Sequence, residues 1–172
     1  IDVRNNGETD MAWAASLEES NGDVGMYPSL TYDTQGIGHV SYVDATRDNL
    51  MYIDTLNRVR AIVDDGFRMG EETTNDGLPS PIYHLVGDSS SIQLIGTKPL
   101  IAYQDSTTLQ VRFAQLNPDG SWTHRALAGH DMPFKGAYGF YTTMRVKDSH
   151  AVVASYVINQ QVTPAEFYVD VL

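Results

Sequence analysis

The segment at residues 27–56, YPSLTYDTQGIGHVSYVDATRDNLMYIDTL, restricts the possible folds more than any other part of the chain. It alternates short runs rich in β-branched and aromatic residues with turns that contain glycine and aspartate, which is the pattern of consecutive antiparallel hairpins. Its run YVDAT at 42–46 returns as YQDST at 103–107, and Tyr52 falls on Phe113 at the same spacing. The sequence therefore predicts a fold built from repeated small sheets.

A third copy of the pattern lies near the C-terminus. Gly25, Tyr27, Ser41 and Tyr42 match, in this order, Gly139, Tyr141, Ser155 and Tyr156 without a gap. The predicted strands are Pro28–Asp33, His39–Ala45, Asn49–Leu56 and Arg58–Val63 in the first copy, Ser90–Ile95, Leu100–Ser106, Leu109–Leu116 and Ser121–Ala128 in the second, and Phe140–Lys147, Ala151–Ile158 and Ala165–Leu172 in the third. Each complete copy thus has four short strands, which are expected to pair as one antiparallel sheet.

Units of about 50 to 60 residues with four antiparallel strands are typical of β-propeller blades. One such sheet cannot bury both faces alone, so blades stack around an axis, and Tyr42, Tyr103 and Tyr156 are predicted to fill the gaps between them. We expect an all-β fold with one partial propeller domain over 1–172. Its parts are 11–24, the last strand of a preceding blade and a loop, then blades at 25–88, 89–135 and 136–172, the last without its outer strand.

The number of blades is too small for a closed ring. The chain supplies about three blades, whereas propellers contain about four to eight, and the unpaired edges of an open ring must be covered. The sequence begins with Ile1 and ends in YVDVL, inside a predicted strand, so both ends are expected to be cut. The ring is therefore expected to be closed by another polypeptide, either a fragment of the same processed precursor or a second copy. In the second case the MAWAASL run at 11–17, a short strand or helix turn, would complete the partner's last blade.

Composition excludes several classes of function. There are 22 acidic and 11 basic residues, for a formal net charge of −11, and such a surface repels phosphate, so nucleic-acid binding is not expected. No apolar run approaches the ~18 residues of a membrane-spanning helix, so membrane insertion is not expected either. The absence of cysteine excludes disulfides, thiolate metal sites and a cysteine nucleophile. An acidic, cysteine-free chain fits a bacterial exported protein, whether secreted, periplasmic or at the cell surface, but also an ordinary cytosolic one.

The first copy also carries a family resemblance. Its pattern Y-x-S-L-x-x-D-x-x-G-x-x-H-x-S-Y-x-D resembles the repeats of bacterial exported or surface β-propellers that are distantly similar to the sialidase-like (BNR) superfamily. Sialidase-like enzymes carry Asp-boxes, an arginine triad and a Tyr/Glu nucleophile pair. The stretch nearest to an Asp-box here is 117–122, whose spacing differs, and no pair of carboxylates is distinguished as a glycosidase would require. Enzymatic activity of this chain is therefore disfavoured.

Candidate binding residues lie in the turns. Asp44, Asp48 and Asp105 lie at or beside the turns between second and third strands, where they could bind Ca²⁺ or a sugar hydroxyl, or cap backbone N–H groups. His130 and Asp131 lie in a loop between blades, where a metal ligand and a solvated loop are the two interpretations. No dedicated cofactor motif occurs.

Residues 64–88, which are rich in glycine, proline and acidic side chains, are predicted to form a long functional or mobile loop with one short strand near Ile82–Val86.

Three functions fit these features. The first is a non-enzymatic binding or scaffolding propeller that presents its inter-blade loops to a protein or glycan. The second is a subunit of a sialidase-like or other glycoside-processing enzyme whose catalytic residues lie on missing blades. The third is a purely structural component of a larger assembly.

Overall fold

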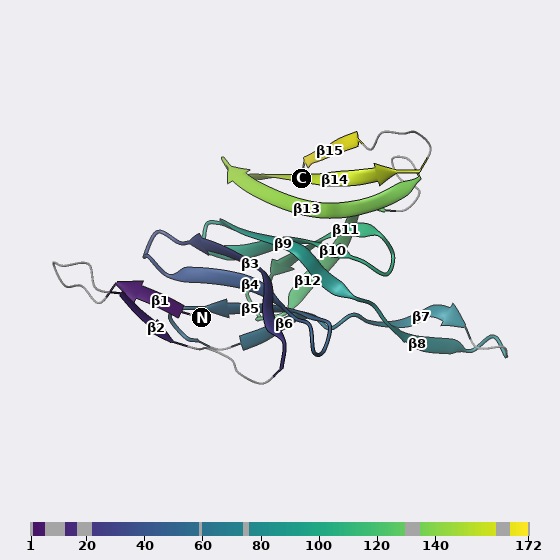
Figure 1. The fold of residues 1–172 in the computed structure, drawn as a ribbon, viewed down its shortest axis with the longest axis horizontal. Coiled ribbons are helices and arrows are strands. Elements are labelled where there is room, and N and C mark those ends of the chain that lie inside the picture. The colour runs from purple at the N-terminus through teal and green to yellow at the C-terminus, as the bar shows by residue number, and fades with distance from the viewer. Residues whose placement is uncertain are drawn as a thin grey trace.

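A computed structural model describes residues 2–5, 13–16, 22–58, 60–73, 76–129, 135–160 and 166–171. Three antiparallel sheets form the body, and their strands follow one another in chain order (Figure 1). The first sheet contains β3 (Val24–Tyr32), β4 (Gly38–Asp44), β5 (Asn49–Asp54) and β6 (Arg60–Asp64), the second contains β9 (Val86–Ile95), β10 (Lys98–Asp105), β11 (Gln110–Leu116) and β12 (Trp122–Ala128), and the third contains β13 (Gly136–Lys147), β14 (His150–Asn159) and β15 (Glu166–Val171). The all-β prediction is confirmed.

Two further hairpins lie outside the three sheets. The first pairs β1 (Asp2–Asn5) with β2 (Trp13–Ser16), and the second pairs β7 (Phe67–Thr73) with β8 (Pro79–Tyr83). Residues 2–5 therefore form a strand, and the run that contains Trp13 is a strand rather than a helix turn. The predicted long loop between the first and second sheets is wrong, because two of its segments, β7 and β8, pair as the second hairpin.

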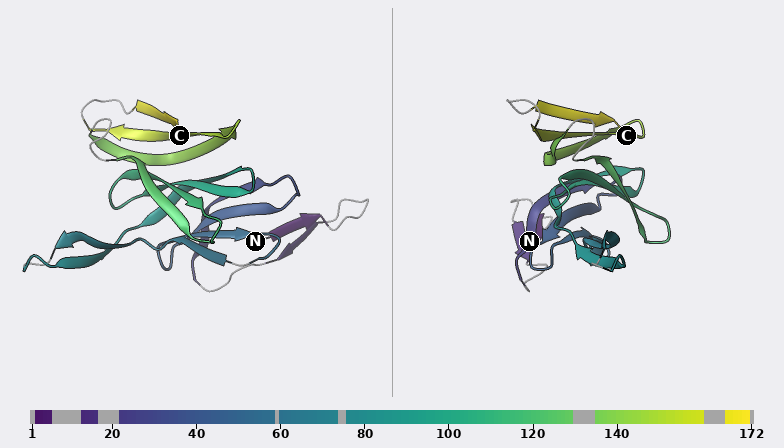
Figure 2. Two further views of the ribbon diagram at one scale, coloured as in Figure 1. Left: turned by 180° about the vertical axis from the view of Figure 1, so that it is seen from behind. Right: turned by 90° about the vertical axis from the view of Figure 1, so that its right-hand side faces the viewer.

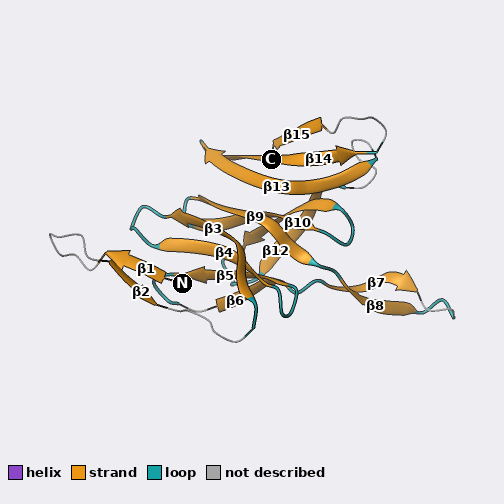
Figure 3. Ribbon diagram, in the orientation of Figure 1, coloured by secondary structure: helices purple, strands orange, loops and turns teal. Residues whose placement is uncertain are grey.

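All regular elements of the described ranges are strands (Figure 3). In those same ranges we find no helix of the length and hydropathy that crossing a membrane requires.

The three sheets lie face over face, with β3, β9 and β13 next to one another (Figures 1 and 2). Between the first and second sheets, Leu50 and Tyr52 share a core with Ile92, Ile101 and Tyr103. Alternation places these side chains on one face of each strand, as the period of two requires. Each large apolar side chain buried in this way contributes about 1.5 to 3 kcal/mol.

A second core joins the second and third sheets. Leu100, Ala102 and Phe113 of the second sheet pack there against Met144 and Val153 of the third. The second sheet therefore buries both faces, one against each neighbour. This is the packing expected of consecutive propeller blades.

The first strand of each sheet repeats one backbone irregularity. Gly25, Gly87 and Gly139 have φ of +91°, +101° and +91°, and the residues two positions later, Tyr27, Ser89 and Tyr141, have φ of 49°, 53° and 52°. Register shifts in the pairing with the second strand occur at the same places. The sequence match of Gly25 and Tyr27 with Gly139 and Tyr141 therefore corresponds to equal local structure.

The second strand of the third sheet is aligned one residue differently from the sequence match. Ile101 pairs with Ile92, and Val153 occupies the same position opposite Met144. Two residues further on, Tyr103 is therefore equivalent to Ser155 rather than to Tyr156. The predicted equivalence of Tyr42 and Tyr156 is wrong for this reason. The Tyr156 ring packs on the opposite face, beside Phe140 and Tyr141.

Candidate functional site

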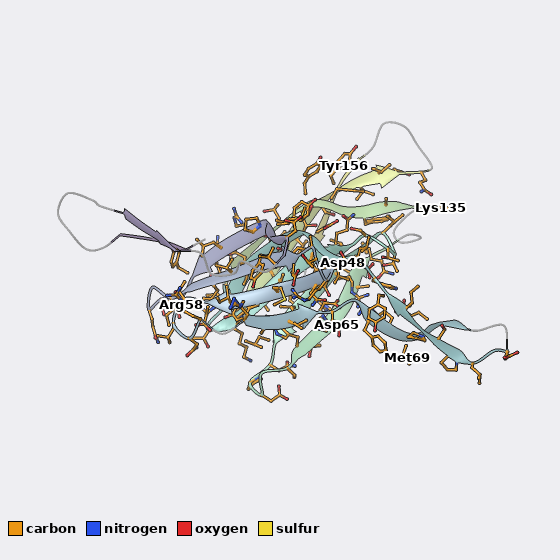
Figure 4. All side chains as sticks on the ribbon, turned by 60° about the horizontal axis from the view of Figure 1, so that its bottom comes forward. Asp48, Arg58, Asp65, Met69, Lys135 and Tyr156 are labelled. Atoms are coloured by element: carbon orange, nitrogen blue, oxygen red, sulfur yellow. The ribbon has the colours of Figure 1, made fainter. Side chains whose placement is uncertain are left out.

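The β7–β8 hairpin stands away from the body, between the last strand of the first sheet and the first strand of the second (Figures 1 and 2). Figure 4 shows Met69 on this projecting part and Asp65 near its base. An isolated two-stranded hairpin is only marginally stable in water. A hairpin that projects in this way therefore needs an anchor at its base.

One face of the hairpin is apolar and open to solvent. Phe67 pairs with Tyr83 and Met69 with Pro81, so these four side chains share that face. The Phe67 and Tyr83 rings pack edge to face with their centroids 5.4 Å apart. Met69 and Tyr83 are nevertheless 60% and 70% exposed. We call these four residues the hairpin face. An exposed apolar surface of this kind is typical of interaction sites.

The β8 edge of the hairpin is protected against pairing with another strand. Pro79 and Pro81 lack the N–H group that an added strand would need. Gly70 in β7, with φ of +82°, lies at a shift in register that twists the ribbon. Recognition through the hairpin therefore depends on the side chains of its face.

A buried ion pair fixes the start of the hairpin to both sheets. Asp64 at the end of β6 accepts hydrogen bonds from Arg68 Nη1 and Nη2 at 3.0 and 2.9 Å. The Tyr103 hydroxyl of the second sheet donates to the same carboxylate at 2.7 Å and lies 3.2 Å from His124 Nδ1. The N–H of Gly66 completes the set at 2.9 Å. Two sheets and the hairpin thus meet at one carboxylate.

A buried histidine fixes the other end of the hairpin. His84 Nδ1 lies 2.8 Å from Asp105 Oδ2, and its Nε2 lies 3.2 Å from Glu71 Oε2. The His84 N–H also donates to the Gly66 carbonyl at 2.9 Å and closes the hairpin. This approach is so close that a Cβ on Gly66 would lie 2.1 Å from the His84 carbonyl oxygen. We call these polar side chains at the base of the hairpin the anchor network, and they are Asp64, Arg68, Tyr103, His124, Glu71, His84 and Asp105.

Burial and hydrogen bonds shift the pKa values of Asp64 and of two of its neighbours, Tyr103 and His124. Burial opposes ionisation of Asp64, but hydrogen bonds from Arg68, Tyr103 and the Gly66 N–H outweigh it and lower its pKa to about 2. Burial also raises the pKa of Tyr103, and the Asp64 charge adds to this effect. Burial lowers the pKa of His124, partly against the attraction of Asp64. Asp64 is therefore ionised at neutral pH and is unsuited to act as a general acid.

The Asp64 pairing predicts a stability that depends on pH. The pKa of this carboxyl is lower in the folded chain than its ordinary value of 3.8. Its contribution is therefore complete above about pH 4 and is lost as the pH falls toward 2, by about 2 to 3 kcal/mol. Urea unfolding between pH 6 and 2 should show this loss in the native chain and not in Asp64→Asn. Parallel pH profiles for the two chains would contradict the assignment.

The predicted turn aspartates occupy different environments. Asp44 is buried, accepts the Thr46 N–H at 3.0 Å and pairs with Arg47 Nη1 at 2.6 Å. Asp105 at the equivalent position of the second sheet is fully buried and accepts the Thr108 N–H at 3.0 Å. The structure therefore brings Asp105 into the anchor network and leaves Asp44 within its own turn.

The remaining predicted residues are less constrained. Asp48 is exposed in the β4–β5 turn, with φ of 56°. His130 and Asp131 lie outside the described residues. Among the residues that are described, no group of three or more His, Asp or Glu side chains could hold a metal ion.

The sequence did not single out most of the anchor network. Asp64 and Glu71 fall in the segment predicted to be a loop, and His84 is one of five histidines without a recognisable spacing. The one available signal was the equivalence of Asp44 and Asp105, which marked Asp105. Its partner His84 lies 21 residues away, a separation that no local pattern reveals.

Comparisons with known proteins place the fold. An α-L-arabinofuranosidase from Lactobacillus brevis matches 87% of this chain at 12% identity with a TM-score of 0.58, over 50% of its own length. An exo-1,5-α-L-arabinanase from a bovine ruminal metagenomic library matches 98% at 9% identity with a TM-score of 0.47, over 61% of its length. No protein-family model matches the chain. No curated protein matches its sequence.

The match to the arabinofuranosidase decides the fold class. This chain has a β-propeller-like fold. The chain spans about half the length of that solved structure. A sequence identity of 12% supports a conclusion about the fold alone.

Proposed function

We propose that this protein is a non-enzymatic binding propeller whose β7–β8 hairpin is the element that contacts its partner. The observation that carries the proposal is the hairpin face, an exposed apolar surface held by a buried anchor network. Binding surfaces that are rigid before contact lose less conformational entropy on association. The resemblance of the first repeat to exported sialidase-like propellers supports a location outside the cytoplasm, at a bacterial surface or in the periplasm.

The partner is a protein with an apolar patch and a basic rim. Phe67, Met69 and Tyr83 supply aromatic and thioether surface, which is enriched in the centres of interfaces. Asp65, just before β7, and Asp76, between β7 and β8, are both exposed, in a chain with a net charge of −11. Acidic residues at the rim favour encounter with a basic surface and make the association rate dependent on salt.

Peptide selection tests this proposal. A random phage-displayed peptide library is selected on the native chain, and the recovered peptides are synthesised and measured by calorimetry. We expect aromatic or aliphatic residues beside Lys or Arg. The double variant Met69→Ser/Tyr83→Ser should weaken their binding by about tenfold or more, because few central residues carry most interface energy.

A matched control separates the hairpin from general surface hydrophobicity. Leu56 in the β5–β6 turn is 67% exposed but lies off the hairpin, so Leu56→Ser should leave peptide binding unchanged. Equal losses for the two variants would overturn the proposal, as would peptides without apolar residues. Glycan-array binding that survives the double variant would also assign recognition to another surface.

A glycoside-processing enzyme subunit is the second candidate. It is favoured by the fold match to an α-L-arabinofuranosidase. Against it, Asp64 and Asp105 are held by Arg68, Tyr103, His84 and backbone N–H groups. A panel of chromogenic glycosides tested on the full precursor decides between the two, because the catalytic residues of this candidate would lie on its other blades.

A further inference from the structure

Each sheet of the body has two faces with different roles. We call the face that packs on the preceding sheet the rear face, and the opposite one the forward face. In the second sheet, Ile92 and Ile101 lie on the rear face, and Leu100 and Ala102 on the forward face. Both faces of that sheet are covered by neighbouring sheets. It therefore shows which positions are buried when a sheet lies on each side.

Hydrogen bonds between sheets fix which residues are equivalent. The Ile92 N–H donates to Ser29 Oγ at 3.1 Å, and the Met144 N–H donates to Ser91 Oγ at 2.9 Å. Ile92 and Met144 thus receive the same contact from the preceding sheet. Leu30 occupies the corresponding position in the first sheet, opposite Val40.

The rear face of the first sheet is apolar and is exposed along its two outer strands, β3 and β6, whereas Tyr42 and Met51 on its central strands are buried. Leu30 is 52% exposed, whereas its equivalent Ile92 is fully buried. Ile62, in β6, is exposed on the same face. A Cβ added to Gly25 meets no atom of the described residues within 4 Å, while one on Gly87 would lie 2.8 Å from Val43 of the preceding sheet. Among the described residues, nothing beside Gly25 takes the place that the first sheet takes beside Gly87.

The forward face of the third sheet, at the other end of the body, also has exposed apolar side chains. Val152 is 39% exposed, whereas the equivalent Leu100 is 2% exposed because the third sheet covers it. Ile158 on the same face is also exposed. The chain thus carries at its two ends the two halves of the interface that it uses twice internally.

We propose that two copies of this chain associate head to tail, with the forward face of the third sheet of one copy on the rear face of the first sheet of the other. Contacts between unlike faces are heterologous and close into a ring when the rotation allows it. Two copies supply about six blades, within the range of about four to eight in which propellers close. Like charge on the copies opposes this contact, so association strengthens with salt, as screening shortens the Debye length to about 10 Å at 0.1 M.

Complementation between variants tests the head-to-tail arrangement. A rear-face variant, Leu30→Asp/Ile62→Asp, and a forward-face variant, Val152→Asp/Ile158→Asp, are each examined by light scattering and native mass spectrometry. We expect the native chain at twice the mass of one copy or more, and each variant alone at the mass of one copy. An equimolar mixture should form a dimer with one copy of each variant, because one intact interface remains.

The outcomes separate this proposal from the function proposed for the hairpin. The variant Met69→Ser/Tyr83→Ser should associate as the native chain does, since its changes lie on neither end face. Far-UV circular dichroism checks that all variants fold, and the single change Val152→Asp replaces the double one if it does not. A native chain that stays monomeric at every salt concentration overturns the proposal. A mixture of folded variants without a mixed dimer does so equally.

Discussion

Replacing Asp64 with alanine is expected to lower the free energy of unfolding by about 3 to 5 kcal/mol, because it leaves Arg68 without its buried counter-ion. Arg68 donates two hydrogen bonds to this carboxylate, and the Tyr103 hydroxyl donates a third. All of these donors lose their acceptor at once, and a buried donor without an acceptor costs about 1 to 3 kcal/mol. Urea unfolding monitored by tyrosine and tryptophan fluorescence measures the change.

The neighbouring residue supplies the matched control. Asp65 has the same chemistry but is exposed, and its carboxylate accepts the Phe67 N–H at 3.0 Å. Asp65→Ala should therefore cost about 1 kcal/mol or less. Similar losses for the two alanine variants would show that the anchor network contributes no more than a turn cap does.

A double variant separates an unpaired charge from lost packing. Arg68→Met removes the charge that Asp64→Ala leaves behind while keeping an unbranched apolar side chain. Replacement of a buried ion pair by apolar residues is often close to neutral. The variant Asp64→Ala/Arg68→Met should accordingly be more stable than Asp64→Ala alone. If it is less stable, the loss in the single variant arises from packing.

The fold was predictable because its signals are local. The alternation in β4 and β10, and the glycine and aspartate turns that follow, are encoded within a few residues each. Because the same sequence pattern occurs three times, it predicted three such sheets. The irregular pairing near Tyr156 was missed because a register shift of one residue leaves the composition of a strand unchanged.

The candidate site was largely unpredictable for the opposite reason. Asp64 and Asp65 are adjacent and chemically identical, and only the direction in which β6 ends decides which one is buried. The partners Tyr103 and His124 come from another sheet. The exposed face of the β7–β8 hairpin was hidden because glycine, proline and acidic residues are as common in loops as at protected sheet edges.

Replacing Gly87 with alanine should disturb the packing between the first two sheets, whereas the same change at Gly25 should not. Both glycines have φ in the left-handed range, +101° and +91°, so each substitution costs about 1 to 2 kcal/mol in backbone strain. At Gly87 the added Cβ would also lie 2.8 Å from Val43 Cγ2 and 3.1 Å from Leu50 Cβ. Overpacking of this kind costs about 1 to 3 kcal/mol more.

The comparison isolates the cost of contact between blades. Both substitutions are made in the Val152→Asp background, so that a second copy does not fill the space beside Gly25. Gly87→Ala should then lower the free energy of unfolding by about 2 to 5 kcal/mol, and Gly25→Ala by about 1 to 2 kcal/mol. Equal losses in the free energy of unfolding for the two variants would mean that the first two sheets accommodate the added methyl group at Gly87 without cost. The same two substitutions can also be made in the native chain. If the losses for Gly87→Ala and Gly25→Ala differ less there than in the Val152→Asp background, a neighbouring chain lies beside Gly25, as the head-to-tail contact requires.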